Sequence, residues 1–266
     1  MTQLSTTHGL PVEDVQIDGC RLTEVTHWPA LCISPHQHDA LKICIPLEGA
    51  FTESDGLNIR SPRAMDVLIR GSRRAHANQY GGRGARSLLL EIPPDHRSAC
   101  DLTGVEGIVL QRPETRRAVA AVVRTFRRQS DRAVGLPLAV RWLLASIDGC
   151  RRPPPPARLD RVREYLAEHW AEPLRLNQLA AFAGVHPVYL SHAFRNHFGQ
   201  TLSAYLQALR LFHATELLRS NANIGAIAVD CGFFDQSHFT HAFERQHQIP
   251  PGLYRKALAE NALRQP

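Results

Sequence analysis

The fold of the carboxyl-terminal half is decided by residues 179–206, LAAFAGVHPVYLSHAFRNHFGQTLSAYL, whose pattern returns in residues 227–254, IAVDCGFFDQSHFTHAFERQHQIPPGLY. In each copy an alanine-containing apolar segment runs into a glycine, Gly184 in the first and Gly232 in the second. Helices commonly end at such a glycine, because glycine adopts a positive φ without steric penalty. Apolar residues then recur at helical spacing. Each copy is therefore predicted to be two short helices joined by a tight turn.

The second predicted helix of each copy has one apolar face and one polar face. Leu190 and Phe194, or Phe239 and Phe243, are expected to point inward. The opposite face carries side chains that can contact phosphates or base edges: Val188, Ser191, His192, Arg195, Gln236, Ser237, His241 and Arg245. This arrangement is typical of a helix-turn-helix, whose second helix enters a major groove. A plain helical bundle is the alternative for one copy, and the tandem repeat favours DNA binding.

The segments GVHPVYLSHAFRNHFG and CGFFDQSHFTHAFERQHQIPPGLYR resemble the AraC-type (AraC/XylS family) transcriptional regulators. The resemblance covers residues 159–256 and, more loosely, the amino-terminal part. It implies two helix-turn-helix motifs joined by a long helix over residues 201–219, with promoter DNA and RNA polymerase as partners. It also implies base contacts from Val188, Ser191, His192, Gln236, Ser237 and His241, and phosphate contacts from Arg195 and Arg245.

Three features of the copies depart from the family or from common helix chemistry. His186 occupies a cap position where Ser or Thr is usual, which is expected to weaken the helix slightly. His247-Gln248 stands where the family has Phe-Gly, so the last turn of the second copy is expected to be less firmly packed. Substitution of His192 by Ala is therefore expected to weaken DNA binding more than the same change at His241. Phe234 replaces the usual Ser before Asp235.

Histidines are frequent in or beside the predicted recognition helices. Protonation near pH 6 would add positive charge facing the phosphates. We expect DNA affinity to rise as the pH falls from about 7.5 to 6. The histidines concerned are His186, His192, His197, His238, His241 and His247.

The length of 266 residues allows two domains of ordinary size. No apolar run reaches transmembrane length and no signal peptide is evident, so a cytoplasmic protein without membrane contact is expected. Six cysteines lack CxxC spacing, which predicts buried thiols rather than a zinc knuckle or disulfides. Formal charge changes from about −3 in residues 1–110 to about +7 in 111–152 and about +2 in 158–258. This distribution is compatible with a polyanionic partner, and equally with a solvated surface.

Residues 12–92 are predicted to form short strands. The segments LKICIPL, FTESDGLNI, AMDVLIR and ARSLLLEI are separated by Gly, Pro and Asp at intervals of about ten residues. Such spacing is typical of an antiparallel sandwich or barrel. His36 and His38 are expected to share one strand face, and His76 could join them from another strand.

The histidines of this region resemble a cupin site, whose first motif is His-x-His followed by Glu and Gly. Lys42 stands where the glutamate would be, and a lysine ammonium cannot ligate a metal. The resemblance implies effector binding by His36, His38, Lys42 and His76, or a divalent metal such as zinc on the three histidines. The favoured alternative is that they line a small-molecule pocket, or are simply hydrogen-bonded, without metal. Arg70, Arg73 and Arg74 would suit an anionic effector.

Residues 111–150 are predicted to form two antiparallel helices. Their apolar stripes are Val119, Val122, Val123 and Phe126, and Leu138, Trp142, Leu143 and Leu144. In the AraC family such helices often dimerise, which makes a homodimer the expectation; covering the barrel in a monomer is the alternative. Four prolines at 153–156 predict a semi-rigid linker between two separate bodies.

The predicted fold class is α+β. A cupin-like antiparallel β-barrel (jelly roll) with flanking helices comprises residues 1–110, a helical dimerisation element 111–150, a proline-rich linker 151–157, and an all-α double helix-turn-helix domain 158–258. The predicted function is that of a non-enzymatic, sequence-specific transcriptional regulator, an activator by resemblance, that responds to a small-molecule effector. The alternatives are a metal-dependent cupin enzyme (oxygenase or isomerase) fused to a DNA-binding domain, and a structural DNA-binding protein whose barrel only dimerises.

Overall fold

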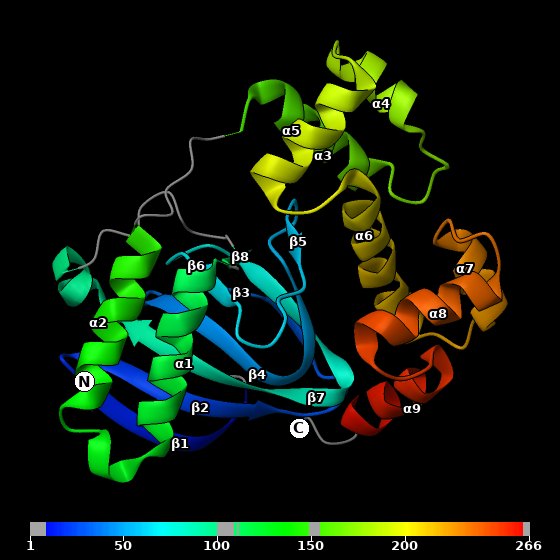
Figure 1. The fold of residues 1–266 in the computed structure, drawn as a ribbon. Helices are drawn as coiled ribbons and strands as arrows, with labels where there is room; N and C mark the ends of the chain where they lie inside the picture. The colour runs from blue at the N-terminus through cyan, green and yellow to red at the C-terminus, as the bar shows by residue number, and fades with distance from the viewer. Residues whose placement is uncertain (1–8, 100–108, 111, 149–154, 263–266) are drawn as a thin grey trace.

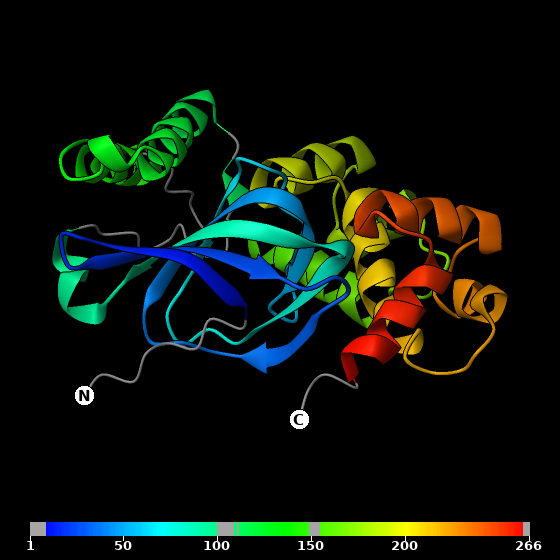
Figure 2. The same cartoon turned by 90° about the horizontal axis from the view of Figure 1, so that it is seen from below.

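The computed structural model describes residues 9–99, 109–110, 112–148 and 155–262. A bent antiparallel sheet carries two helices on one face, and an all-helical carboxyl-terminal part lies against the opposite end of the sheet (Figure 1, Figure 2). The fold is α+β, as predicted. Most of the predicted linker, together with Cys100 and Cys150, lies outside the described residues.

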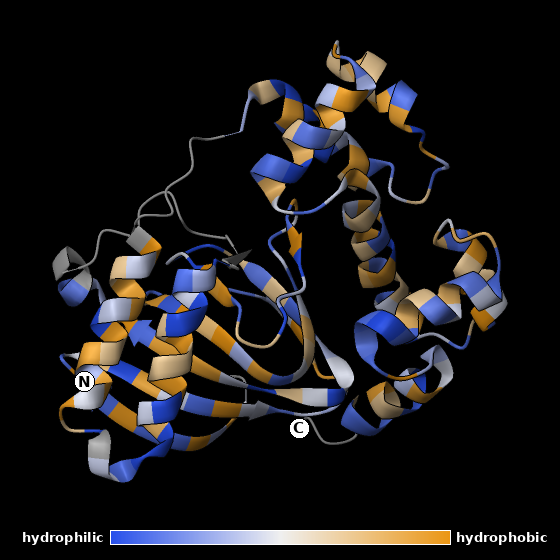
Figure 3. Cartoon of the chain, viewed as in Figure 1, coloured by the Kyte–Doolittle hydropathy of each residue, from blue (hydrophilic) through white to orange (hydrophobic). Residues whose placement is uncertain are grey.

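The sheet has eight strands in the described part of the chain, ordered β1-β2-β7-β4-β6-β8, with β3 paired to β7 and β5 to β4. Their bounds are β1 Leu10–Ile17, β2 Cys20–His27, β3 Cys32–His36, β4 Leu41–Ser54, β5 Ile59–Arg60, β6 Val67–Arg70, β7 His76–Ile92 and β8 Val109–Leu110. A short 3-10 turn, Pro94–Ala99, follows β7. Hydrophobic and hydrophilic residues alternate along the strands (Figure 3), as expected where one face is buried.

The two strands predicted at residues 41–47 and 51–59 are largely one strand, β4, which pairs with β7 from Leu41↔Ile92 to Ser54↔Ala77. The pairing register shifts twice around residues 46–51. Gly49 lies at this irregularity with φ of 77°, and a Cβ there would come within 2.1 Å of the Gly84 carbonyl oxygen. Gly49 therefore lies in a β-bulge that bends a continuous strand, and not in a turn that ends the strand.

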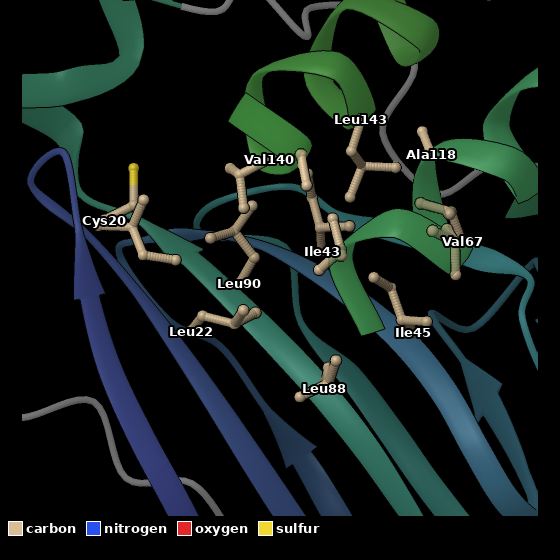
Figure 4. Close-up of a cluster of buried hydrophobic side chains, with 14 of the residues drawn as sticks. Cys20, Leu22, Ile43, Ile45, Val67, Leu88, Leu90, Ala118, Val140 and Leu143 are labelled. Carbon is tan, nitrogen blue, oxygen red and sulfur yellow. The ribbon is translucent and has the colours of Figure 1, made fainter. Parts of the chain in front are cut away.

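Helices α1 (Pro113–Arg127) and α2 (Gly135–Asp148), separated by the 3-10 turn Gln129–Asp131, cover one face of the sheet. Val119, Val122 and Phe126 are buried in the same cluster as the sheet residues Ile43 and Leu90. Val140 and Leu143 of α2 complete this core (Figure 4). The apolar stripe of α1 is therefore used within the chain, in agreement with the alternative that these helices cover the sheet.

The carboxyl-terminal part contains seven helices among its described residues: α3 Ala157–Glu168, α4 Leu176–Ala183, α5 Pro187–Phe198, α6 Leu202–Leu217, α7 Ile224–Asp230, α8 Gln236–His247 and α9 Pro251–Ala262. Helix α6 is the predicted long connecting helix, slightly shorter than expected. It supplies buried residues to two cores, Tyr205 and Leu209 to the one around α4–α5, and Leu211 and Ala214 to the one around α7–α8.

The sheet and the helical part are docked against each other, contrary to the expectation of two separate bodies. Ile59 of β5 is buried in the core of α3–α6, and Ala30 is buried in the core of α6–α9. The Gln79 amide donates to the Phe212 carbonyl at 3.0 Å, and the Tyr254 hydroxyl donates to the Tyr80 carbonyl at 2.9 Å. Each of the two helical cores therefore contains an apolar residue of the sheet domain.

Two further sequence expectations can be compared with the fold. Cys44 and Cys231 are free and buried, Cys20 is buried, and Cys32 is free and half-buried, so the buried-thiol prediction holds for most of the described cysteines. Among the helices of the described ranges, none has both the length and the apolarity that a bilayer crossing needs.

Candidate nucleic-acid interface

The first helix-turn-helix consists of α4, a turn centred on Gly184, and α5. Gly184 has φ of 65° and donates its N–H to α4 carbonyls, as the sequence predicted. His186 is the cap of α5, and its Nδ1 accepts the Val188 N–H at 3.3 Å. Pro187 follows, where a missing N–H removes no helical hydrogen bond. The expectation that His186 weakens the helix is therefore wrong, because its imidazole performs the capping role of a serine or threonine oxygen.

The second helix-turn-helix consists of α7, a turn through Gly232, and α8. A Cβ at Gly232 would come within 2.4 Å of the Ala171 carbonyl, and its φ is 73°, so only glycine fits this close turn. Asp235 caps α8 by accepting the His238 N–H at 2.7 Å. We did not predict this cap. Its signal was an aspartate directly before a helical pattern.

Matched aromatic cores hold the two recognition helices against α6 and α9. In the first unit the rings of Phe194 and Tyr205 lie 5.6 Å apart, centroid to centroid. In the second, Phe243 and Tyr254 lie 5.2 Å apart. Both pairs meet edge to face, a favourable aromatic geometry. The repeated sequence pattern therefore corresponds to the same side-chain packing in the two units.

The last turn of the second unit is well packed, which corrects the expectation from its unusual ending. His247 is 2% exposed, and its ring lies 4.2 Å from that of Phe243, as Phe198 lies 4.5 Å from Phe194. Gln248 has φ of 66° and ends α8 in the left-handed conformation that Gly199 adopts after α5. His247 and Gln248 thus reproduce the Phe-Gly ending with other residues.

The predicted DNA-contacting side chains lie on the exposed faces of α5 and α8. Seven of them are exposed and Ser191 is half-buried; the exposed ones are Val188, His192, Arg195, Gln236, Ser237, His241 and Arg245. Within the described part of the chain, neither Arg195 nor Arg245 forms an ion pair. Tyr189 is also exposed, and Phe234, directly before the α8 cap, is 90% exposed. Both lie beside the predicted contacts and were not assigned a role from the sequence.

One of the six histidines expected to gain charge at low pH cannot do so readily. Burial lowers the pKa of His247 to about 3. The imidazole therefore stays neutral in the folded protein at pH 6. His247 therefore does not contribute to the expected pH effect on DNA binding.

In the sheet domain the structure brings together the three predicted histidines. The ring centroids of His36 and His76 are 4.4 Å apart, those of His38 and His76 5.0 Å, and those of His36 and His38 6.2 Å. His36 and His76 are cross-strand partners in β3 and β7. Burial lowers the pKa of each ring, that of His38 to about 3. The cluster is therefore a group of neutral imidazoles.

The predicted metal site is not formed by these rings. No group of three or more His, Cys, Asp or Glu side chains in the described residues has an arrangement that could hold a metal ion. Lys42 contributes to lowering the pKa of all three imidazoles, as does Arg70, so the cluster faces two cations. The residues present do not fit a resident metal.

Lys42 and Arg70 were expected to face an effector, and the structure corrects this too. Lys42 Nζ lies 2.7 Å from a Glu91 carboxylate oxygen, with both side chains nearly buried. Arg70 pairs with the buried Glu53. Arg73 lies at the surface, 3.3 Å from Asp39. The cations inside the sheet are thus neutralised by partners from the same domain.

Comparisons with known proteins agree with this geometry. Residues 179–257 match a family described as a helix-turn-helix domain. The regulatory protein PocR of Salmonella typhimurium is 30% identical over 110 residues, covering 41% of this chain and 36% of that protein. The HTH-type transcriptional activator RhaR of Klebsiella pneumoniae is 35% identical over 101 residues, covering 38% and 36%.

Among solved structures, the C-terminal domain of AraT, a response regulator from Geobacillus stearothermophilus, is 31% identical with a TM-score of 0.37, covering 38% of this chain and 86% of that one. The match to the two curated relatives spans only about a third of their length. Residues 179–257 are therefore a helix-turn-helix domain similar to those of the regulatory proteins PocR and RhaR.

Proposed function

We propose that this protein is a sequence-specific DNA-binding transcriptional regulator, in which α5 and α8 enter the major groove. The observation that carries the proposal is that α5 and α8 each expose a polar face. Each of these helices follows a turn that contains a glycine and begins at a residue whose side chain caps the helix. The exposed polar side chains are of types suited to base edges, and the unpaired guanidinium of Arg195 is suited to phosphates, whereas Arg245 lines the space between the domains. The matched relative RhaR is named as a transcriptional activator, which supports activation rather than repression here.

The connecting helix sets the separation of the two units. Helix α6 has 16 residues, which at about 1.5 Å per residue spans about 24 Å. Successive major-groove faces on one side of a duplex are about 34 Å apart, and α5 and α8 share buried cores with different parts of α6. The geometry supports contact with two adjacent groove segments by one chain.

The test is genome-wide mapping of bound DNA, followed by titration of a recovered duplex with purified protein. The variant Arg195→Gln should weaken binding and reduce its salt dependence, because one phosphate contact is lost. The matched control is Arg158→Gln, since Arg158 is an exposed arginine on α3 away from the recognition faces. If both variants bind like wild type, or if no duplex is enriched, α5 is not a recognition helix.

We further propose that the sheet domain, as a cupin-like barrel, senses a small molecule and passes the signal to the helices docked on it. The direct contacts of β5 with α6, and of β7 with α8 and α9, support this route. A thermal-shift screen should reveal a stabilising ligand if the sensor proposal is correct. An enzyme is the competing class, and catalytic turnover by the purified protein would argue against a purely sensory sheet domain.

We also propose a homodimer through α2. Leu138 and Trp142 are exposed on α2, and Val134 lies one turn before them, so the three make an apolar stripe at intervals of four residues. The opposite face of α2 is already buried against the sheet. A rigid, exposed apolar stripe of this kind suits contact with a second copy of the same helix.

A further inference from the structure

A hollow in the described part of the chain lies between the two domains, and not inside the sheet. This open cavity of about 1090 Å³ is lined by the bend of β4, β5 and the segment after it, the start of α1, the end of α5, the first half of α6 and the end of α8. Inside the sheet, the space beside Glu53, Arg70 and His76 is only about 20 Å³. An effector of ordinary size therefore has room between the domains and not beside the histidines, where the sequence placed it.

The walls of this cavity are basic. Four arginines line it, and no Asp or Glu is among its lining residues within the described ranges. Arg60 is already paired with Asp55 at 2.9 Å, and Arg112 also has an interaction partner. Arg63 and Arg245 are exposed, and their guanidinium groups have no hydrogen-bond or ion-pair partner in the described residues. One comes from the sheet domain and the other from α8, so two uncompensated guanidiniums face a common space from different domains.

The cavity is also pre-formed, because hydrogen bonds between the domains fix its walls. The Gln200 amide donates to the Ile59 carbonyl at 2.9 Å, and the Gln246 amide donates to the Thr52 hydroxyl at 2.6 Å. Ile59, Gln200 and Gln246 line the space, and Thr52 lies on β4 next to the lining residue Phe51. A site whose walls need no rearrangement binds with a smaller entropic penalty.

We propose that this interdomain cavity binds a small molecule carrying at least two negative charges, held by Arg63 from the sheet domain and Arg245 from α8. Guanidinium groups favour carboxylate and phosphate partners in charge-assisted hydrogen bonds. Because Arg245 lies one turn beyond His241 on α8, the same ligand would contact the edge of the recognition helix. This role as the effector site rests on the proposed function of the protein as a regulator. Anion binding in the cavity can nevertheless be measured without DNA.

The experiment is isothermal titration of the full chain with citrate and with pyrophosphate, in buffers of matched ionic strength, with acetate as the single-charge comparison. We expect saturable binding of citrate or pyrophosphate at one molecule per chain, and the tighter of the two identifies a carboxylate or a phosphate ligand. Acetate should bind at least about tenfold more weakly, since it lacks a second charge.

The variants Arg63→Gln and Arg245→Gln should each weaken the tighter probe by at least about tenfold, whereas Arg158→Gln should bind it like wild type. Both lining arginines are exposed, so their substitution should leave the fold intact, which circular dichroism would verify. The proposal is overturned by failure of both polyanions to bind at millimolar concentration, or by equal binding in all variants. Because the readout contains no DNA, it is independent of whether the chain regulates transcription.

Discussion

At the residue scale, His247 has a different role from the one its sequence suggested. It stands among exposed histidines of a recognition helix, yet its imidazole is fully buried and its Nε2 has no hydrogen-bond partner. Nothing in the local sequence distinguishes it from His241, because its burial depends on Tyr254, seven residues later. The Phe at the equivalent position of the first copy, Phe198, was the available signal. A position occupied by Phe in one copy is expected to be apolar in the other.

Replacement of His247 by Phe should stabilise the protein and remove part of its sensitivity to acid. The pKa of His247 is lowered in the folded state, so the unfolded chain binds a proton that the folded chain does not. Its contribution is constant above the unfolded pKa of about 6.5 and falls by about 1.4 kcal/mol per pH unit below it. His247→Phe should therefore gain about 1 kcal/mol at pH 7, by removing an unsatisfied buried nitrogen, and more at pH 5.5.

Urea unfolding of wild type and His247→Phe at both pH values would measure this difference. His241→Phe is the matched control, since His241 is exposed on the same helix and its substitution should not change the acid dependence of stability. An equal loss of stability on acidification in wild type and His247→Phe would show that the buried imidazole is not responsible.

The two recognition histidines should now contribute comparably to DNA binding. The sequence predicted a larger effect for His192, because the second unit was expected to be loosely packed at its end. Since His247 and Gln248 restore that packing, the physical reason for the difference is gone. We expect His192→Ala and His241→Ala each to weaken binding of a recovered operator by about 1–2 kcal/mol. An anisotropy titration in which one variant loses tenfold more affinity than the other would contradict this equivalence.

At the element scale, the helices were more predictable than the strands. Gly184, Gly232 and the Phe spacing set the boundaries of α4, α5, α7 and α8, because helix termination and apolar periodicity are local properties. Strand β4 was divided in two because Gly49 looks like a turn in sequence, whereas it is a bulge whose pairing with β7 is long-range. The partners of Lys42 and Arg70 could not be predicted for the same reason, since Glu91 and Glu53 reach them only through strand register.

Long-range packing also could not be predicted for α1 and α2, whose apolar stripes were both assigned to a dimer. Only the exposed stripe of α2 remains available for that contact. The double variant Leu138→Glu, Trp142→Glu should convert a dimer to a monomer without unfolding the chain, because Leu138 is 60% exposed and Trp142 43% exposed. Sedimentation velocity at micromolar concentration would measure this change.

Val12→Glu provides the matched control for the dimer variant, since Val12 is an equally exposed apolar residue on β1. It should leave the sedimentation coefficient unchanged. A wild-type protein that sediments as a monomer would refute the proposed dimer, and a dimer that survives the double substitution would place the contact elsewhere.

At the scale of the whole molecule, the docking of the two domains is the feature that matters most for a regulator, and the sequence did not predict it. The prolines near residue 155 lie between the sheet domain and the helical part, but a linker sequence does not indicate which surfaces of the two domains pack together. Ile59 looked like the end of a strand, and it is instead part of the core of the first helix-turn-helix unit. A change in the sheet can therefore alter the placement of a recognition unit through direct contact, without motion of the linker.

If that docking couples the domains, loss of the Ile59 side chain should uncouple their unfolding. Ile59 packs against residues of α3–α6 and is 1% exposed, so Ile59→Ala should cost about 2–4 kcal/mol, chiefly at the interface. Calorimetry should show one transition for wild type and two for Ile59→Ala, the helical part unfolding separately from the sheet. Leu10→Ala, at an exposed apolar residue of β1, should retain the single transition. One transition in Ile59→Ala, merely shifted to lower temperature, would mean that Ile59 supports stability without coupling the domains, and a signal from the sheet would then need another route.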